Sequence, residues 1–161
     1  MKVLIVSDTH GMDDNLEWVV NHEAPIDAMI HCGDIEGSEE YFELLLDCPV
    51  YMVRGNNDFF SDLEGEIVVT LGDKRCMVTH GHYYGVSMGP ERIMEEGLAR
   101  DIDVVMFGHT HKPLLIEEND ITVLNPGSLS LPRQIGRKPS YMIMEIDEKN
   151  NLKIFKKVVD N

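Results

Sequence analysis

Short apolar runs alternate with amphipathic stretches in the first third of the chain. Residues 3–7, 28–32 and 50–53 are rich in Val, Ile and Met, which is typical of strands covered on both faces. Between them, residues 13–21 and 38–46 carry apolar side chains at helical spacing, with Asp13 or Asp14 as the cap of the first helix. The pattern predicts a βαβαβ start.

The second half of the chain is predicted to be mostly strand. Residues 66–71 and 74–79 flank Gly72-Asp73, a dipeptide that favours a hairpin turn. One helix is expected over residues 91–100, with Pro90 in its first turn. Further strands are expected at residues 104–107, 114–118, 121–124, 141–146 and 152–158, with turns at Asn119-Asp120 and 148–151. Early helices and late strands predict two sheets packed face to face, with helices outside.

Composition and charge exclude several classes of partner. The length of 161 residues predicts a single domain over residues 1–161. The net charge of −15 would repel a long nucleic acid, whereas bound dications would still admit a small phosphate ester. No apolar run has the length of a secretory signal or a membrane span, so no membrane association is expected. Three cysteines, none in a metal-type pair, indicate a cytoplasmic protein. A homo-oligomer stays an open alternative.

Five polar motifs each follow directly after an apolar run. In an open α/β sheet, ligands bind at the carboxyl ends of the strands, so these side chains are expected to converge. Two Asp, one Asn and four or five His are too many for one ion and suit two, which predicts a two-metal hydrolase. The motifs are Asp8-Thr9-His10, Gly33-Asp34, Gly55-Asn56, His80-Gly81-His82 and Gly108-His109-Thr110-His111.

Taken singly, the motifs differ in how strongly they indicate a metal site. Asp8 and His10 are two residues apart, so both side chains can leave an extended strand end on one side, but a helix cap and a surface histidine are an equal alternative. His109 and His111 repeat that spacing, and two such histidines favour metal ligation over packing. A lone Gly-Asp or Gly-Asn is more often a turn or loop. The two other histidines, His22 and His31, are expected to be structural.

In this order, the motifs resemble those of the calcineurin-like metallophosphoesterases. The short length, Gly55-Asn56-Asn57-Asp58 and Asn125-Pro126-Gly127-Ser128 resemble the small YfcE-type phosphodiesterase branch. The resemblance runs from residue 1 to about residue 133. It implies an α/β (α+β) fold, a four-layer αββα double β-sandwich.

The resemblance also implies two divalent metal ions. One would be held by Asp8, His10, Asp34 and His111, and the other by Asp34, Asn56, His80 and His109. Asp34 would bridge the two ions, and a hydroxide between them would attack phosphorus in line with the leaving oxygen. Manganese is our first expectation, although these donors also suit nickel, iron or zinc.

The chain departs from the family pattern after Gly55-Asn56. Many members carry a histidine there that binds phosphate or protonates the leaving group, whereas this chain has Asn57, which cannot act as an acid. A positioned acid is worth about 10²–10⁴ in rate. His82 would replace it, or else would support a neighbouring metal ligand. We therefore expect small phosphodiesters, or esters with acidic leaving groups, to be preferred, with a phosphomonoesterase as the alternative.

Several further residues are candidates for substrate contact. Tyr83 and Tyr84 are expected either to pack or to form an aromatic wall. The candidates for phosphate binding are Arg54, Asn57, Ser128 and Arg133. An alternative of another class is a protein-binding scaffold, because the retromer scaffold subunit has a similar fold with a degraded metal site. The complete set of ligand residues disfavours that alternative.

Overall fold

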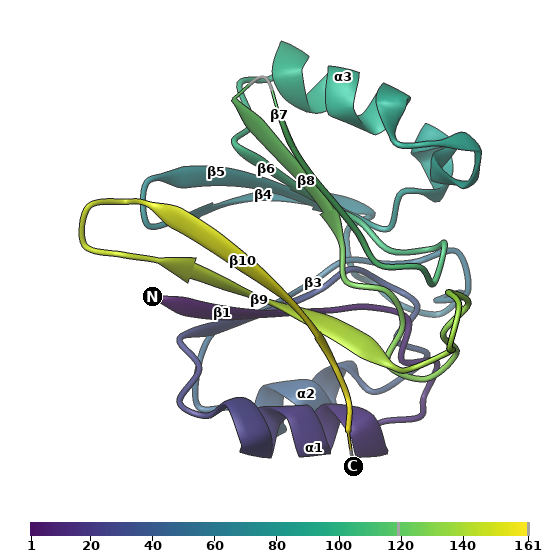
Figure 1. The fold of residues 1–161 in the computed structure, drawn as a ribbon. Coiled ribbons are helices and arrows are strands. Elements are labelled where there is room, and N and C mark those ends of the chain that lie inside the picture. Colours follow the sequence, from purple (N-terminus) through teal and green to yellow (C-terminus); the bar gives the residue numbers. More distant parts are fainter. Residues whose placement is uncertain (119, 161) are drawn as a thin grey trace.

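Two five-stranded mixed sheets form the centre of the molecule (Figure 1). The structure is a computed structural model, and it describes residues 1–118 and 120–160. The first sheet has the strand order β10-β9-β1-β2-β3 and the second β4-β5-β6-β8-β7. The strands are β1 (Lys2–Val6), β2 (Ala28–His31), β3 (Val50–Met52), β4 (Glu66–Leu71), β5 (Lys74–Thr79), β6 (Val104–Met106), β7 (Leu114–Glu118), β8 (Ile121–Asn125), β9 (Ser140–Ile146) and β10 (Leu152–Val158).

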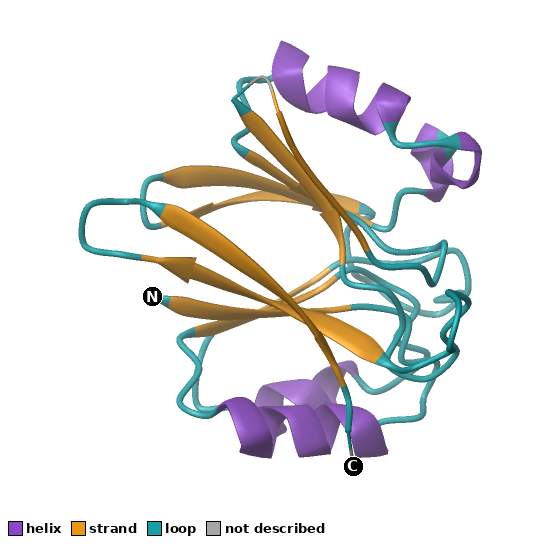
Figure 2. Ribbon diagram, viewed as in Figure 1, coloured by secondary structure: helices purple, strands orange, loops and turns teal. Residues whose placement is uncertain are grey.

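Helices cover the outer faces of both sheets, as Figure 2 shows. Helices α1 (Asp14–Glu23) and α2 (Glu39–Leu45) lie against the first sheet, and α3 (Glu91–Ala99) lies over the second. Two short 3-10 helices, η1 (His82–Tyr84) and η2 (Val86–Met88), precede α3. The predicted α/β class, with two sheets face to face and helices outside, is therefore confirmed.

The ends of several elements differ from the prediction for local reasons. Helix α1 continues to Glu23, and no side-chain hydrogen bond caps it, because the carboxylate of Asp13 accepts a hydrogen bond from Ser38 instead. Pro90 occupies the N-cap position of α3, not its first turn. The 3-10 helices have no apolar periodicity to reveal them. Of the predicted turn at Asn119-Asp120, Asn119 lies outside the described residues.

The main core lies between the sheets, because the inner faces of both consist of aliphatic and sulfur-containing side chains. Ile5 and Ile30 from the first sheet pack in one cluster with Val78 and Met106 from the second, and all four are fully buried. Strand β1 is central: it pairs in parallel with β2 and antiparallel with β9. Within the described part of the chain, no helix combines the length and apolarity needed to cross a membrane.

A buried carboxylate joins α1 to three strands of the first sheet. Glu23 Oε2 lies 2.8 Å from Lys2 Nζ, and its Oε1 lies 2.7 Å from Lys157 Nζ and accepts a hydrogen bond from Tyr141. Burial alone would raise the pKa of Glu23, but the two ammonium groups and the Tyr141 hydroxyl lower it to about 2. The carboxylate therefore stays charged inside the fold.

Candidate metal centre

The five polar motifs meet at one edge of the double sheet. They follow β1, β2 and β3 of the first sheet, which run parallel to one another, and β5 and β6 of the second, which form another parallel pair. The loops after these strands gather on the right in Figure 1. Because parallel strands present their carboxyl ends on the same side, loops from both sheets lie together at this edge.

The backbone at this edge is held in an unusual conformation. A positive φ is uncommon for a residue with a side chain and is concentrated at functional sites. Five of the candidate ligands adopt one: Asp8 (54°), His10 (50°), Asp34 (57°), His109 (68°) and His111 (58°). The surrounding structure therefore keeps these residues in a geometry that costs free energy.

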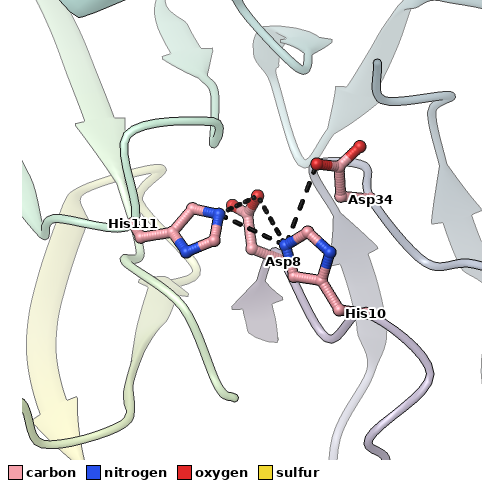
Figure 3. Close-up of side chains that lie close together, drawn as sticks. All are labelled: Asp8, His10, Asp34 and His111. Carbon is pink, nitrogen blue, oxygen red and sulfur yellow. Dashed lines mark hydrogen bonds and ion pairs between the residues drawn. The ribbon is translucent and has the colours of Figure 1, made fainter. Parts of the chain in front are cut away.

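Four of the predicted ligands form one compact cluster (Figure 3). One ligand atom from each of Asp8, His10, Asp34 and His111 lies within 4.8 Å of the others. Within residues 1–118 and 120–160, no other group of three or more His, Cys, Asp or Glu side chains forms such a cluster. The Nε2 atoms of His10 and His111 face each other at 3.2 Å. Asp8 Oδ1 lies 3.1 Å from His111 Nε2 and 3.7 Å from His10 Nε2. Two imidazoles and two carboxylates directed at one point suit a borderline dication.

Asp34 lies between this cluster and a second group of donors. Its Oδ2 is 3.8 Å from His10 Nε2 and 3.4 Å from His80 Nε2. The resemblance assigns those two imidazoles to different ions. One carboxylate oxygen thus faces donors of both predicted sites, which is the position that a bridging ligand needs.

The second group comprises His80, His109 and Asn56. The rings of His80 and His109 meet edge to face with centroids 5.2 Å apart, and His109 Nδ1 lies 3.0 Å from the amide oxygen of the exposed Asn56. His80 Nε2 and Asp8 Oδ1 are buried, 3.9 Å apart, and neither has an aligned hydrogen-bond partner in the described residues. Buried polar atoms are rarely left in that state, so these residues fit a bound cation.

Hydrogen bonds to Nδ1 fix the orientation of three imidazoles. Such a bond holds the tautomer in which Nε2 carries a lone pair, and it turns that atom toward the centre. The three bonds, each 2.7 Å long, join His10 to Glu36 Oε1, His80 to the Cys32 carbonyl and His111 to the Leu131 carbonyl.

Electrostatics keep both carboxylates of the centre ionised. Burial alone would raise the pKa of Asp8, but contacts with His111, His80 and Ser7 bring it below its usual value. Burial also opposes ionisation of Asp34, whose pKa is lowered by His80 and by two donors of Asn57. Burial depresses the pKa of His80, yet Asp34 and Asp8 raise it overall. In His109, burial and the neighbouring His80 lower the pKa.

The glycines of the motifs make the close approach of these groups feasible. A Cβ added to Gly55 would strike Asp34 Oδ1, and one added to Gly108 would strike Ser7 Oγ and lie 2.7 Å from Asp8 Oδ2. Both positions have to lack a side chain because a carboxylate of the centre fills the space.

Asp58 is the last residue of the Gly55-Asn56-Asn57-Asp58 motif, and the sequence assigned it no role. Its buried carboxylate accepts four backbone hydrogen bonds, from Asp34 and Gly55 at Oδ2 and from Ile35 and Glu36 at Oδ1, at 2.7 to 2.9 Å. It thereby joins the loop after β2 to the loop after β3. The motif marked this position in the sequence but not its role, since the four partners become visible only in three dimensions.

Two of the remaining predicted residues lie against the centre. Asn57 donates its backbone N–H to Asp34 Oδ1 at 2.9 Å and its amide N–H to Oδ2 at 2.7 Å. The ring of His82 lies 5.5 Å from that of His80 and 6.0 Å from that of His109. Burial and those two imidazoles lower the pKa of His82.

The other candidates for substrate contact differ in exposure and in hydrogen bonding. Arg54 and Arg133 are exposed, and the Arg133 N–H is bonded to the His111 carbonyl. Tyr83 is 72% exposed, whereas Tyr84 donates a hydrogen bond to Glu66.

The expectation that Ser128 contacts phosphate is corrected. Its side chain is fully buried. The hydroxyl donates to the Asp8 carbonyl at 2.7 Å and accepts from the N–H groups of Ser130 and Leu131. With no exposed surface and its hydrogen-bonding capacity used, Ser128 supports the loop of Asp8.

The fold and the centre together define a double β-sandwich protein with a candidate metal site at the carboxyl edge of both sheets. The chain belongs to the calcineurin-like phosphoesterase superfamily, whose domain model matches residues 1–149. The predicted family is thus confirmed.

Individual relatives agree with this assignment. The chain is 35% identical over 173 residues to the phosphodiesterase YfcE of Escherichia coli, covering 91% of this chain and 89% of YfcE. A Streptococcus pneumoniae protein described as a predicted phosphoesterase has the same fold, with a TM-score of 0.80, 26% identity and 97% of each chain covered. Vps29 of Entamoeba histolytica shares the fold at 22% identity, with a TM-score of 0.78 over 99% of this chain and 100% of Vps29.

Proposed function

We propose that this protein is a phosphodiesterase that depends on two divalent cations and hydrolyses small phosphodiesters in the cytoplasm. The first ion would be held by Asp8, His10, Asp34 and His111, and the second by Asp34, Asn56, His80 and His109. Manganese is the proposed metal, with nickel, iron or zinc as alternatives. The observation that carries the proposal is Asp34 Oδ2, which lies within 3.8 Å of imidazole nitrogens from both groups.

The residues of the centre would prepare it for phosphoryl chemistry. When bound, a pair of dications supplies a nucleophile from water at neutral pH and neutralises the phosphoryl oxygens. Asp8 and Asp34 stay ionised because the imidazoles lower the pKa of each. Asn57 holds Asp34 through its backbone N–H and its side-chain amide. Arg54 is exposed and would bind oxygens of the scissile phosphate, whereas Arg133, also exposed, would bind an anionic group elsewhere on the substrate.

The preference for diesters rests on Asn57. An amide cannot protonate a leaving alkoxide, and here it is engaged with Asp34. His82 is the candidate replacement, but burial and the neighbouring imidazoles lower its pKa, which disfavours the protonated form that a proton donor needs. Esters with acidic leaving groups are therefore favoured. The name of the relative YfcE, a phosphodiesterase, supports the same class of substrate.

A scaffold without catalysis is the rival from another class. Its fold would be the same, as the likeness to Vps29 illustrates. A scaffold has no need to keep several residues at positive φ, or to leave Asp8 Oδ1 and His80 Nε2 without an aligned hydrogen bond among the described residues. These features support an enzyme.

A screen of metals and substrates tests the proposal. Bis(p-nitrophenyl) phosphate and p-nitrophenyl phosphate would be compared in Mn²⁺, Ni²⁺, Mg²⁺ and chelator. We expect metal-dependent hydrolysis with the diester faster, and His109→Ala should abolish it while the circular dichroism spectrum is retained. His22→Ala is the matched control, since His22 stacks on Trp18 on the exposed side of α1. Absence of activity with every metal would favour the scaffold, and faster turnover of the monoester would overturn the diester preference.

A further inference from the structure

A cleft beside the candidate centre differs in charge from the rest of the surface. It has a volume of about 630 Å³ and runs from His109 along the segment that follows β6 to the 3-10 helix η2. Two basic residues, Lys112 and Arg133, line it, and no Asp or Glu does. Four other clefts each have at least one carboxylate in their lining. In a chain with net charge −15, this cleft is a local site of positive charge.

The two basic side chains are available for a ligand. Both residues are exposed. Among the described residues, neither side chain lies within 4.0 Å of a carboxylate, whereas Lys2, Arg100 and Lys157 are each engaged with one. The backbone at both positions is fixed to the centre: Lys112 directly follows His111, and the Arg133 N–H donates to the His111 carbonyl at 3.0 Å.

The remaining lining is largely apolar. Four apolar side chains line the cleft: Phe107 and Val86 are buried, Leu114 is half-buried and Met88 is 92% exposed. An apolar wall with two cations suits a ligand that has an apolar body and an anionic group. The volume is that of a small-molecule pocket and exceeds what a single phosphoryl group occupies.

We propose that this Lys112–Arg133 cleft binds one ester arm of the substrate, and that this arm has an apolar body bearing its own carboxylate or phosphate. The proposal rests on the proposed function, because it places the scissile phosphorus at the neighbouring centre. It adds the substrate class: a phosphodiester with a further negative charge on one arm. The cleft on the side of Asn57 contains Glu36 and Glu39 and would repel such an arm.

Three diesters that share a p-nitrophenyl arm provide the test. Their second arms are phenyl, 4-carboxyphenyl and 4-phosphonophenyl, and chromatography of both released phenols gives total hydrolysis whichever arm leaves. We expect kcat/KM to be about tenfold higher for a charged arm than for phenyl. The two charged arms separate a carboxylate ligand from a phosphate-like one.

Substitutions assign the preference to the cleft. Lys112→Gln and Arg133→Gln should each reduce the ratio of charged-arm to phenyl-arm kcat/KM at least threefold. Lys149→Gln, which makes the same charge change in the turn between β9 and β10 at the far end of the molecule (Figure 1), should leave that ratio unchanged. Equal ratios in all variants, or no preference in the unmodified protein, would overturn the cleft assignment while phenyl-arm hydrolysis still supports the proposed function.

A binding measurement keeps the two proposals separable if no diester is hydrolysed. Calorimetric titration in chelator would compare phenyl 4-carboxyphenyl phosphate with diphenyl phosphate. Tighter binding of the charged ligand, weakened by Arg133→Gln and not by Lys149→Gln, supports the cleft independently of catalysis. Equal affinity for both ligands would reject it.

Discussion

At the scale of single residues, the centre depends on groups that hydrogen-bond to the loops and imidazoles around it and so orient the candidate metal ligands. Asp58 is the clearest case, because its two carboxylate oxygens accept four backbone N–H groups from two loops. Glu36 and the Cys32 and Leu131 carbonyls play the same part for three imidazoles. The geometry of the candidate ligands is therefore set by neighbours outside the ligand set.

Replacing Asp58 should destabilise the protein. In Asp58→Asn, an NH₂ group takes the place of one acceptor oxygen and faces two N–H donors, so a buried hydrogen-bond network is broken. We expect the free energy of unfolding to fall by about 2–4 kcal/mol, measured by urea denaturation. Asp62→Asn, in the same loop but exposed, should change it by less than about 0.5 kcal/mol. A similar small loss in Asp58→Asn would contradict the structural role assigned to it.

A methyl group at position 108 should weaken metal binding. The Cβ of Gly108→Ala would strike Ser7 Oγ and crowd Asp8 Oδ2, so the Asp8 carboxylate has to shift from its place in the centre. We expect the dissociation constant for Mn²⁺, measured by calorimetry, to rise at least tenfold. Gly65→Ala is the control, because a Cβ there meets nothing within 4 Å. Unchanged affinity in Gly108→Ala would show that Asp8 is not held against this glycine.

At the scale of elements, the sequence predicted the strands that its apolar runs encode. It did not predict features that depend on contacts between distant residues. The predicted strands before the motifs match β1, β2, β3, β5 and β6 to within two residues, because runs of Val, Ile and Met admit few other structures. The 3-10 helices after His80 were not predicted, since three glycines at positive φ shape them. The candidate ligands came from residue type and motif order. Asp58 and the burial of Ser128 depend on contacts that no local pattern contains.

The carboxylate that joins α1 to the first sheet should make stability depend on acid pH. The folded pKa of Glu23, about 2, lies below the unfolded value of 4.5. Its contribution is therefore complete above about pH 4.5 and is lost as the pH falls toward 2. Because Lys2 and Lys157 are partly exposed, we expect that contribution to be about 2 kcal/mol.

Glu23→Gln isolates this effect from other carboxylates. The difference in unfolding free energy between the two proteins, measured by denaturant titration, should shrink steadily from pH 5 to pH 2.5. Glu148→Gln, at an exposed turn position, should show no such trend. A difference that is constant with pH would mean that Glu23 is not a stabilising carboxylate in the folded state.

At the scale of the whole molecule, both sheets supply donors to the centre. Asp8, His10 and Asp34 follow strands of the first sheet, and His80, His109 and His111 follow strands of the second. A ligand that binds only the folded arrangement stabilises it in proportion to its saturation. Metal binding should thus oppose separation of the two sheets.

Thermal unfolding in Mn²⁺ and in chelator measures this linkage. At a hundredfold excess over the dissociation constant, binding at one site adds about 2.7 kcal/mol, which corresponds to an increase in Tm of about 5–10 °C for a chain of this length. Asp34→Ala should lose most of the shift, because Asp34 faces both groups of donors. An equal shift in Asp34→Ala would place the ions elsewhere.

The central position of β1 has a consequence for synthesis of the chain. Residues 2–6 are synthesised well before one of their two neighbours in the sheet, β9 at residues 140–146. Until β9 is made, the apolar strand β1 has one open edge. The sheet beside the loop that carries Asp8 and His10 is therefore completed only after β9 has been synthesised.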